Sequence, residues 1–159
     1  MSKRLNYGVI VGSLGNVGDR YTLGGYKPGK LTFKDHLAYL SKLPLLDGVE
    51  IFEGNLEGQS LASFAAMVQD HKLKVASVGV DLSGDPKWRY GSLISKKADL
   101  RAEAVAVCQK AMDIAKGCDC ERINIWLAQD GFDYPFQVDY ADQWDYMVEI
   151  GRGSCRERV

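Results

Sequence analysis

The stretch Leu100–Leu127, LRAEAVAVCQKAMDIAKGCDCERINIWL, decides the fold because it holds one complete helix-to-strand unit. Its first part places apolar side chains at steps of three and four residues, at Leu100, Ala104, Val107, Ala111 and Ile114. That spacing predicts one apolar face of a helix. Gly117 predicts the end of this helix, because glycine is the residue preferred just after a helix C-terminus. Residues 122–127 then predict a short strand, so the stretch is typical of an α/β protein.

The same alternation recurs on the N-terminal side of this stretch. Apolar runs predict three earlier strands, at residues 7–12, 48–53 and 74–80. Thr32 and Ser60 each precede an apolar helical pattern and can cap a helix N-terminus. A further helix is predicted after Asp139, which can cap it. Strand and helix therefore alternate about four times, a pattern that builds a parallel sheet through right-handed crossovers.

Two architectures have this alternation, an open doubly wound sheet and a (β/α)8 barrel. A barrel needs about 250 residues, so 159 residues would make only its first half, about four βα units. The long loops follow the first, third and fourth predicted strands, while the turns that lead back into strands are short. Because the loops of a barrel's catalytic face follow strand C-termini, we expect the first half of a TIM barrel.

Alternation along the strands places two polar side chains inside such a barrel. If Val49 and Ile51 pack against helices, Glu50 points to the interior, and the same argument applies to Asn124 in the fourth strand. Interior polar groups need hydrogen-bond partners. A purely structural network explains Glu50 as well as a functional role does.

The overall composition is that of an ordinary soluble globular protein, with 46% hydrophobic and 26% charged residues. A net charge of −1 disfavours a nucleic-acid partner bound through a basic surface. The sequence has no apolar run of the roughly 18 residues that span a bilayer, and its first residues do not resemble a signal peptide. We expect a cytoplasmic protein with no membrane partner.

The cysteine pattern does not predict a metal site. Cys118 and Cys120 form a C-x-C pair, but a zinc site needs two further ligands and the sequence has only two histidines. Cys108 falls on the apolar face of the long helix and is expected in the core. No metal ligand and no catalytic residue is assigned from the sequence.

The loop after the fourth predicted strand, residues 126–137, is the richest in candidate contacts. It mixes amides, carboxylates and aromatic rings, as sugar sites do, because polar groups bond hydroxyls while rings cover the apolar C–H face. The candidate substrate contacts are Trp126, Gln129, Asp130, Asp133, Tyr134 and Gln137. A packed turn without any ligand would have the same composition.

Four stretches also carry a family resemblance by their order and spacing. They are residues 7–12 with Asp19-Arg20, residues 47–50, residues 85–92 with Asp99-Leu-Arg101, and residues 122–126 with Gln129-Asp-Gly131. Together these stretches resemble the sugar isomerases and epimerases that have a xylose-isomerase-like TIM barrel. The resemblance covers nearly all of residues 5–149, although no single motif in it is diagnostic.

The resemblance implies a small-molecule sugar substrate and a divalent metal, Mn, Mg or Co, whose ligands come from strands five to eight and are absent from this fragment. Trp126 and its loop, with Trp88 and Glu53, would keep part of the sugar-binding wall. Xylose isomerases proper carry a histidine after the second strand, where this chain has Phe52-Glu-Gly-Asn55. A related isomerase of aldoses and ketoses, or a ketose epimerase, therefore fits better. The intact enzyme is expected to be a homo-oligomer and the fragment alone to be inactive.

Two other functions stay open on the same barrel, an endonuclease-IV-like DNA repair nuclease and a non-catalytic sugar-binding protein. The nuclease is disfavoured by the two histidines and the net charge of −1.

The C-terminal residues differ from the rest of the chain. We expect residues 1–149 to form the half barrel and residues 150–159 to be a non-native tail, because Gly151–Val159 resembles a translated sequencing adapter. A genuine basic terminus is the alternative. Unpaired outer strands of a half barrel also predict self-association, by aggregation or by pairing of two halves.

Overall fold

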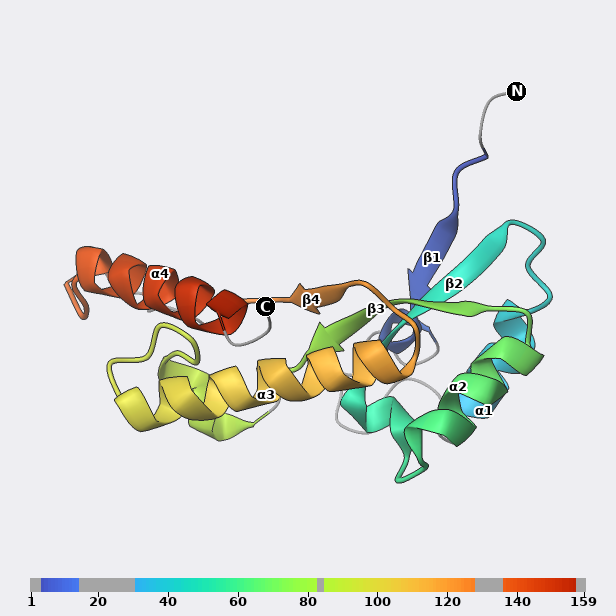
Figure 1. Ribbon diagram of the computed structural model, residues 1–159, viewed down its shortest axis with the longest axis horizontal. Coiled ribbons are helices and arrows are strands. Elements are labelled where there is room, and N and C mark those ends of the chain that lie inside the picture. Colours follow the sequence, from blue (N-terminus) through green and yellow to red (C-terminus); the bar gives the residue numbers. More distant parts are fainter. Residues whose placement is uncertain (1–3, 15–30, 83–84, 128–135, 157–159) are drawn as a thin grey trace. The chain divides into compact units, whose positions relative to one another are not determined.

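A computed structural model of the chain describes residues 4–14, 31–82, 85–127 and 136–156. Strands and helices alternate through these residues (Figure 1). The elements are β1 (Tyr7–Ile10), η1 (Val11–Ser13), α1 (Phe33–Leu40), β2 (Leu46–Phe52), η3 (Glu53–Leu56), α2 (Leu61–Asp70), β3 (Lys74–Val80), η4 (Pro86–Tyr90), α3 (Ala98–Gly117), β4 (Ile123–Ile125) and α4 (Tyr140–Arg156).

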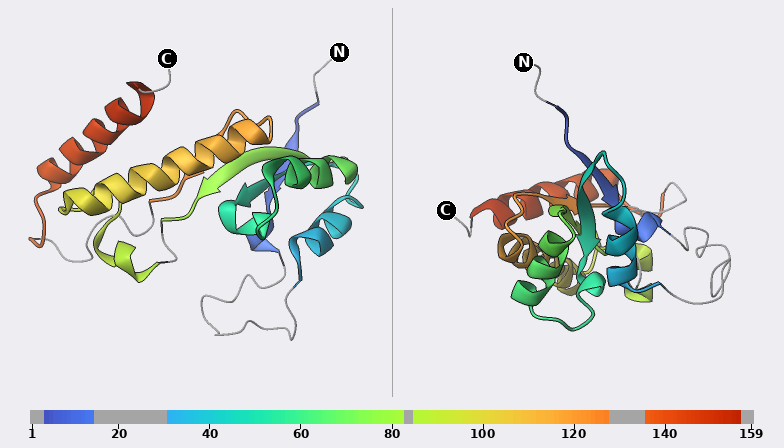
Figure 2. Two further views of the ribbon diagram at one scale, coloured as in Figure 1. Left: turned by 60° about the horizontal axis from the view of Figure 1, so that its bottom comes forward. Right: turned by 90° about the vertical axis from the view of Figure 1, so that its right-hand side faces the viewer.

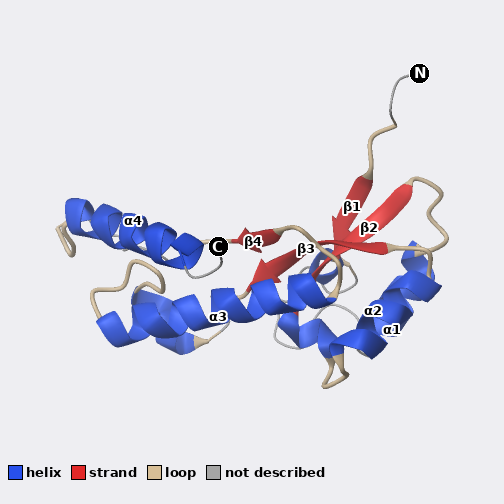
Figure 3. Ribbon diagram, viewed as in Figure 1, coloured by secondary structure: helices blue, strands red, loops and turns tan. Residues whose placement is uncertain are grey.

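The strands form one sheet in the order β1-β2-β3-β4 (Figure 3). β1 pairs with β2 in parallel, and β2 pairs with β3 in parallel. Each strand lies beside the next strand in the sequence, whereas a doubly wound sheet reverses its strand order at a switch point. The predicted first half of a (β/α)8 barrel is confirmed.

The three predicted helix caps are confirmed, and at the start of α4 the Asp139 carboxylate accepts a hydrogen bond from the Ala141 amide at 2.8 Å. The Thr32 hydroxyl accepts a hydrogen bond from the Asp35 amide at 3.2 Å, and the Asp35 carboxylate accepts one from the Thr32 amide at 2.9 Å. This reciprocal capping box also lowers the pKa of Asp35, chiefly through its hydrogen bond from the Thr32 side chain. Ser60 caps α2 by accepting a hydrogen bond from the amide of Ser63 at 3.2 Å.

The helix α3 ends at Gly117 as predicted, but the left-handed residue of its C-terminal turn comes two positions later. Gly117 is the last residue of the helix, and Asp119 takes the left-handed conformation at φ 53°. The amide of Cys120 bonds the carbonyl of Ala115 at 2.9 Å, which completes a Schellman motif with Asp119 in the place where glycine is usual. Gly117 lies close to α2: a Cβ there would lie 2.9 Å from Cδ1 of Leu61.

The helix α2 ends with the same motif. Lys72 has φ 60°, and the amide of Leu73 bonds the carbonyl of Val68 at 3.3 Å. Leu73 and Val68 are both buried, as the apolar contact that accompanies a Schellman motif requires. Both helices therefore end in a left-handed residue that is not glycine.

The chain divides into two compact units, one of residues 1–79 with 113–123 and the other of residues 80–112 with 124–159. In the first unit α1 and α2 lie side by side (Figure 2), and the rings of Phe33 and Phe64 stack with centroids 4.9 Å apart. The fully buried Val49 and Ile51 of β2 also belong to this core. Fully burying side chains of this size stabilises the fold by about 1.5–3 kcal/mol each.

The second unit is built on the N-terminal part of α3. Trp88, Leu93, Ala104 and Cys108 are buried there, and the burial of Cys108 agrees with its predicted place in the core. The guanidinium of Arg101 lies 4.0 Å from the ring centroid of Tyr146, which joins the start of α3 to α4. No helix among the described residues is long and apolar enough to cross a bilayer.

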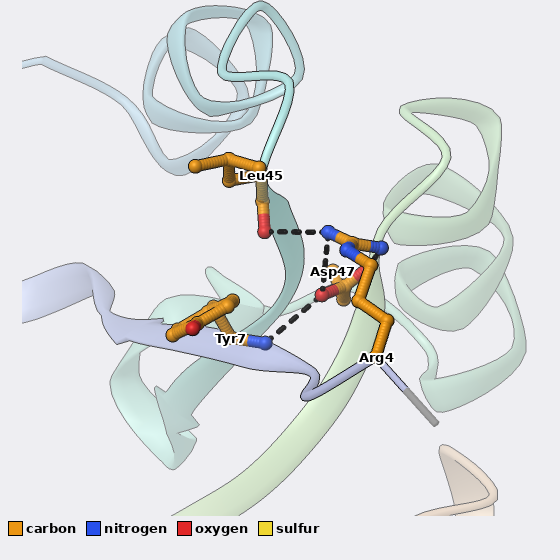
Figure 4. Close-up of polar contacts among 4 residues, drawn as sticks. All are labelled: Arg4, Tyr7, Leu45 and Asp47. Atoms are coloured by element: carbon orange, nitrogen blue, oxygen red, sulfur yellow. Dashed lines mark hydrogen bonds and ion pairs between the residues drawn. The ribbon is translucent and has the colours of Figure 1, made fainter. Parts of the chain in front are cut away.

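The edge strand β1 is shorter than predicted, because residues 11–13 form a 3-10 turn. A polar clamp holds its start (Figure 4): Arg4 bonds Asp47 at 3.0 Å and the Leu45 carbonyl at 3.0 Å, and the Tyr7 amide donates to Asp47 at 2.9 Å. The hydrogen bond from Tyr7, followed by that from Arg4, lowers the pKa of Asp47. Tyr7 and Ile10 stay exposed on this edge, and the predicted self-association stays a prediction.

Candidate functional site

The first unit holds a carboxylate and an aromatic ring near the C-terminal ends of β2 and β3, where barrel enzymes place their sites. Glu50 and Ser77 are register partners on neighbouring strands, and the Ser77 hydroxyl donates a hydrogen bond to the Glu50 carboxylate. Both residues are half-buried, whereas the neighbouring Val49 and Ile51 are fully buried. The Glu50 carboxylate thus has a partner, and its interior position and any chemical role stay predictions.

Phe52 covers the end of β3. Phe52 and Gly79 are register partners, and a Cβ at Gly79 would lie 2.3 Å from Cε1 of the Phe52 ring. The ring therefore occupies the space that any side chain at residue 79 would need. The amide of Phe52 donates to Asn55 at 2.8 Å, which fixes the turn that follows β2.

The turn after β2 carries Glu53. This residue begins η3 directly at the C-terminal end of β2, and it is exposed. The turn ends at Glu57, which has φ 49° and accepts a hydrogen bond from the Phe33 amide at 3.4 Å. The carboxylate lies at the strand end where barrel enzymes place their sites, and its role as a substrate contact stays a prediction.

The second unit holds the other described candidates in different environments. Trp88 is 2% exposed and packs into the core, with the amine of Lys87 lying 4.6 Å from its ring centroid. Trp126 is 65% exposed and offers its ring to solvent at the end of β4. Asn124, in β4, is also exposed. Of the two tryptophans, only Trp126 has the open face that stacking on a sugar requires.

The structure describes only some of the candidate substrate contacts in the loop after β4. Gln137 is exposed, and its carbonyl accepts a hydrogen bond from the amine of Lys96 at 3.2 Å. The other four lie outside the described residues, namely Gln129, Asp130, Asp133 and Tyr134. The mixture of amides, carboxylates and rings predicted for this loop therefore stays a prediction.

One group of residues was missed from the sequence, a cationic pocket that is lined by η4 and the start of α3. Its side chains include Lys87, Arg89, Lys96 and Lys97. The only signal was the density of basic residues in Lys87-Trp-Arg89 and Lys96-Lys97.

A second cavity, of about 360 Å³, lies in the first unit at the opposite end of β3, where α2 and α3 end. Lys72, Lys74 and Asp119 contribute to its lining, together with Cys118. Burial, followed by the nearby Cys120, raises the pKa of the Cys118 thiol. In a barrel this face serves stability rather than catalysis.

The described residues do not make a metal site. Within them no three side chains of His, Cys, Asp or Glu gather closely enough to hold an ion. The Glu50 carboxylate is instead bonded to Ser77.

The chain matches no protein-family model and no curated protein. It is similar to the solved structure of D-psicose 3-epimerase in the presence of D-fructose, with a TM-score of 0.66 and 20% identity over 94% of this chain. It is also similar to the D-psicose 3-epimerase with D-tagatose from Clostridium cellulolyticum H10, with a TM-score of 0.65 and 18% identity over 96% of this chain.

A third similar structure is a fusion protein of a xylose isomerase-like TIM barrel with 4-hydroxyphenylpyruvate dioxygenase. Its TM-score is 0.57, with 15% identity over 97% of this chain and 20% of the fusion protein. The chain spans 47% and 48% of the two epimerase chains, about half of their length. The chain therefore has the fold of the first half of a xylose-isomerase-like (β/α)8 barrel.

Proposed function

We propose that this chain is the N-terminal half of a sugar isomerase or epimerase, which converts a ketose into its epimer or into an aldose. The observation that carries the proposal is the likeness to two D-psicose 3-epimerase structures over 94% and 96% of the chain. The same barrel supports many reactions, so the proposal also rests on side chains near strand ends.

Two described residues support sugar binding. The exposed ring of Trp126 at the end of β4 can cover the apolar face of a sugar. The exposed carboxylate of Glu53 at the end of β2 can accept hydrogen bonds from two neighbouring hydroxyls. Epimerisation moves a proton at a carbon beside a carbonyl, and a positioned carboxylate is a suitable base for that step.

A divalent metal, Mn, Mg or Co, is part of the proposal for the whole protein. Such an ion would polarise the carbonyl and hydroxyl oxygens of the substrate. The described residues of this chain do not form its cage. The ion would be held by residues of the other half of the barrel, and we expect the 159-residue chain to be inactive by itself.

The test is solvent exchange during turnover by the product of the complete gene. The protein is incubated with D-fructose and Mn²⁺ in D₂O, and proton NMR follows deuterium at C3 together with any aldose formed. Epimerisation predicts deuterium at C3 of both ketoses, and aldose–ketose isomerisation predicts an aldose. A folded protein that binds Mn²⁺ and neither epimerises D-fructose or D-tagatose nor interconverts ketose and aldose with these sugars or D-xylose would contradict the proposal.

A matched pair of variants tests the described residues. Glu53→Gln should lower the rate by about 10²-fold or more, the range for a missing acid–base group. Glu121→Gln removes an exposed carboxylate before β4, at the strand's N-terminal side, and should leave the rate unchanged. Equal rates in the two variants would remove Glu53 from the proposed site.

A further inference from the structure

The cationic pocket of the second unit has the size of a small-molecule site. Two nearby pieces of chain form it. One is η4, with Pro86, Lys87, Arg89 and Tyr90, and the other runs into the first turn of α3, with Ser95, Lys96, Lys97 and Leu100. Its volume is about 720 Å³, inside the range of about 300–1,000 Å³ for ligand pockets. All of its lining residues belong to one compact unit.

The lining of this pocket is strongly positive. Three lysines and one arginine contribute to it, and none of its described lining residues is acidic. The charge of Lys87 is compensated by two carboxylates that do not line the pocket, because its amine lies 2.7 Å from Glu103 and 4.0 Å from Asp85.

The other three cations have no acidic partner among the described residues. Lys96 donates to the neutral Gln137 carbonyl, and the Arg89 guanidinium lies 4.8 Å from the Tyr90 ring centroid. The amine of Lys97 has no partner within the described part of the chain. Their uncompensated charge favours an anionic ligand.

The start of α3 adds to this field. The helix has 20 residues and begins at Ala98, directly after Lys97. Its first internal hydrogen bond runs from the Arg101 amide to the Lys97 carbonyl at 3.1 Å, so the amides before Arg101 are not used by the helix ladder. A helix N-terminus attracts anions, and phosphate above all. Asp99 in the first turn offsets part of this charge.

The rest of the lining suits a carbon skeleton. Pro86, Leu100 and the ring of Tyr90, which is 58% exposed, contribute apolar surface beside the cations. The bond from Lys96 also brings the backbone of Gln137, a predicted sugar contact, to the edge of the pocket. A ligand with an anionic group on a small polyhydroxylated carbon skeleton would contact both the cations and the apolar residues of this pocket.

We propose that the cationic pocket binds the phosphate group of a phosphorylated sugar. This inference rests on the proposed function and narrows its substrate class. Arg89, Lys96 and Lys97 hold the phosphate oxygens by charge-assisted hydrogen bonds, and Tyr90 covers one face of the carbon body.

The test is equilibrium binding to the 159-residue chain, measured by calorimetry at low ionic strength. The probes are fructose 6-phosphate, D-fructose, inorganic phosphate and a short DNA duplex. Fructose 6-phosphate should bind most tightly and D-fructose at least about tenfold more weakly, since a charge-assisted hydrogen bond is worth about that factor. No turnover is needed, so a failed epimerase assay does not decide the result.

Three variants test whether binding depends on the cationic pocket or on surface charge in general. Lys97→Ala and Arg89→Gln should each weaken fructose 6-phosphate binding about tenfold. Lys42→Ala removes an exposed lysine from a turn in the first unit and should change nothing. Circular dichroism confirms that each variant is folded, and Lys97 and Arg89 are both exposed.

Three results would overturn the inference. The first is that fructose 6-phosphate binds no more tightly than D-fructose or inorganic phosphate. The second is unchanged binding in both pocket variants. The third is a preference for the DNA duplex, which would assign the charge to a nucleic acid.

Discussion

Replacing Gly79 by alanine tests how closely the ring of Phe52 covers the end of β3. The new Cβ would lie 2.3 Å from Cε1, 2.6 Å from Cζ and 2.8 Å from Cδ1 of that ring. Overpacking of this kind costs about 1–3 kcal/mol. Alanine also lowers the entropy of the unfolded chain, which returns about 0.5–1 kcal/mol. We expect Gly79→Ala to lower the free energy of unfolding by about 1–2 kcal/mol.

A double-mutant cycle tests whether the ring of Phe52 causes this loss of stability. The free energy of unfolding of each variant is measured by urea unfolding. In a Phe52→Ala background the new methyl group meets no ring, and Gly79→Ala should stabilise by about 0.5 kcal/mol. The coupling energy between the two substitutions should then be about 1.5–2.5 kcal/mol. Gly54→Ala is the control, since a Cβ there has no neighbour within 4 Å. If Gly79→Ala lowers the free energy of unfolding by the same amount with and without the ring of Phe52, the ring is not what excludes a side chain at residue 79.

Three further predictions concern the local chemistry of the first unit. Asp119→Gly should raise the free energy of unfolding by about 1 kcal/mol in a thermal or urea transition, because glycine takes φ 53° without strain; a loss of stability would contradict the assigned turn. The lowered pKa of Asp47 means that its stabilising contribution is complete at neutral pH and is lost as the pH falls through that lowered value. Asp47→Asn should therefore flatten the acid limb of the stability curve, and identical pH profiles for both proteins would refute this. Iodoacetamide should modify the half-buried Cys120 before the buried Cys118, whose raised pKa keeps it a thiol, and peptide mass spectrometry that found the reverse order would refute the assignment.

Features set by neighbours in the sequence could be predicted. The strand Lys74–Val80 has the predicted bounds, because an apolar run bounded by polar residues is a local signal. The caps at Thr32 and Ser60 were also predictable, since each bonds an amide three residues away. The alternation of such elements predicted a parallel sheet, and the long loops after strand C-termini favoured the half barrel over a doubly wound sheet.

Features set by distant residues could not be predicted. Gly117 lies close to Leu61 of another helix, an approach that no local pattern reveals. Trp88 has charged neighbours in the sequence, yet the packing of the second unit buries it in η4. The cationic pocket needs η4 to fold so that Arg89 comes near Lys97, and that approach is a tertiary property.

The left-handed turns at Lys72 and Asp119 bear on the order in which the chain folds. Each turn is closed by hydrogen bonds between residues at most five apart, so it can form as soon as its helix does. The pairing of β1 with β2 instead joins residues about 40 apart, such as Tyr7 and Asp47, and contacts of that separation form slowly. These local turns set the direction of the chain from each helix to the following strand. The chain then has fewer conformations to search before it reaches the native fold. We infer that these two turns direct the early steps, while the edge strand β1 joins the sheet late.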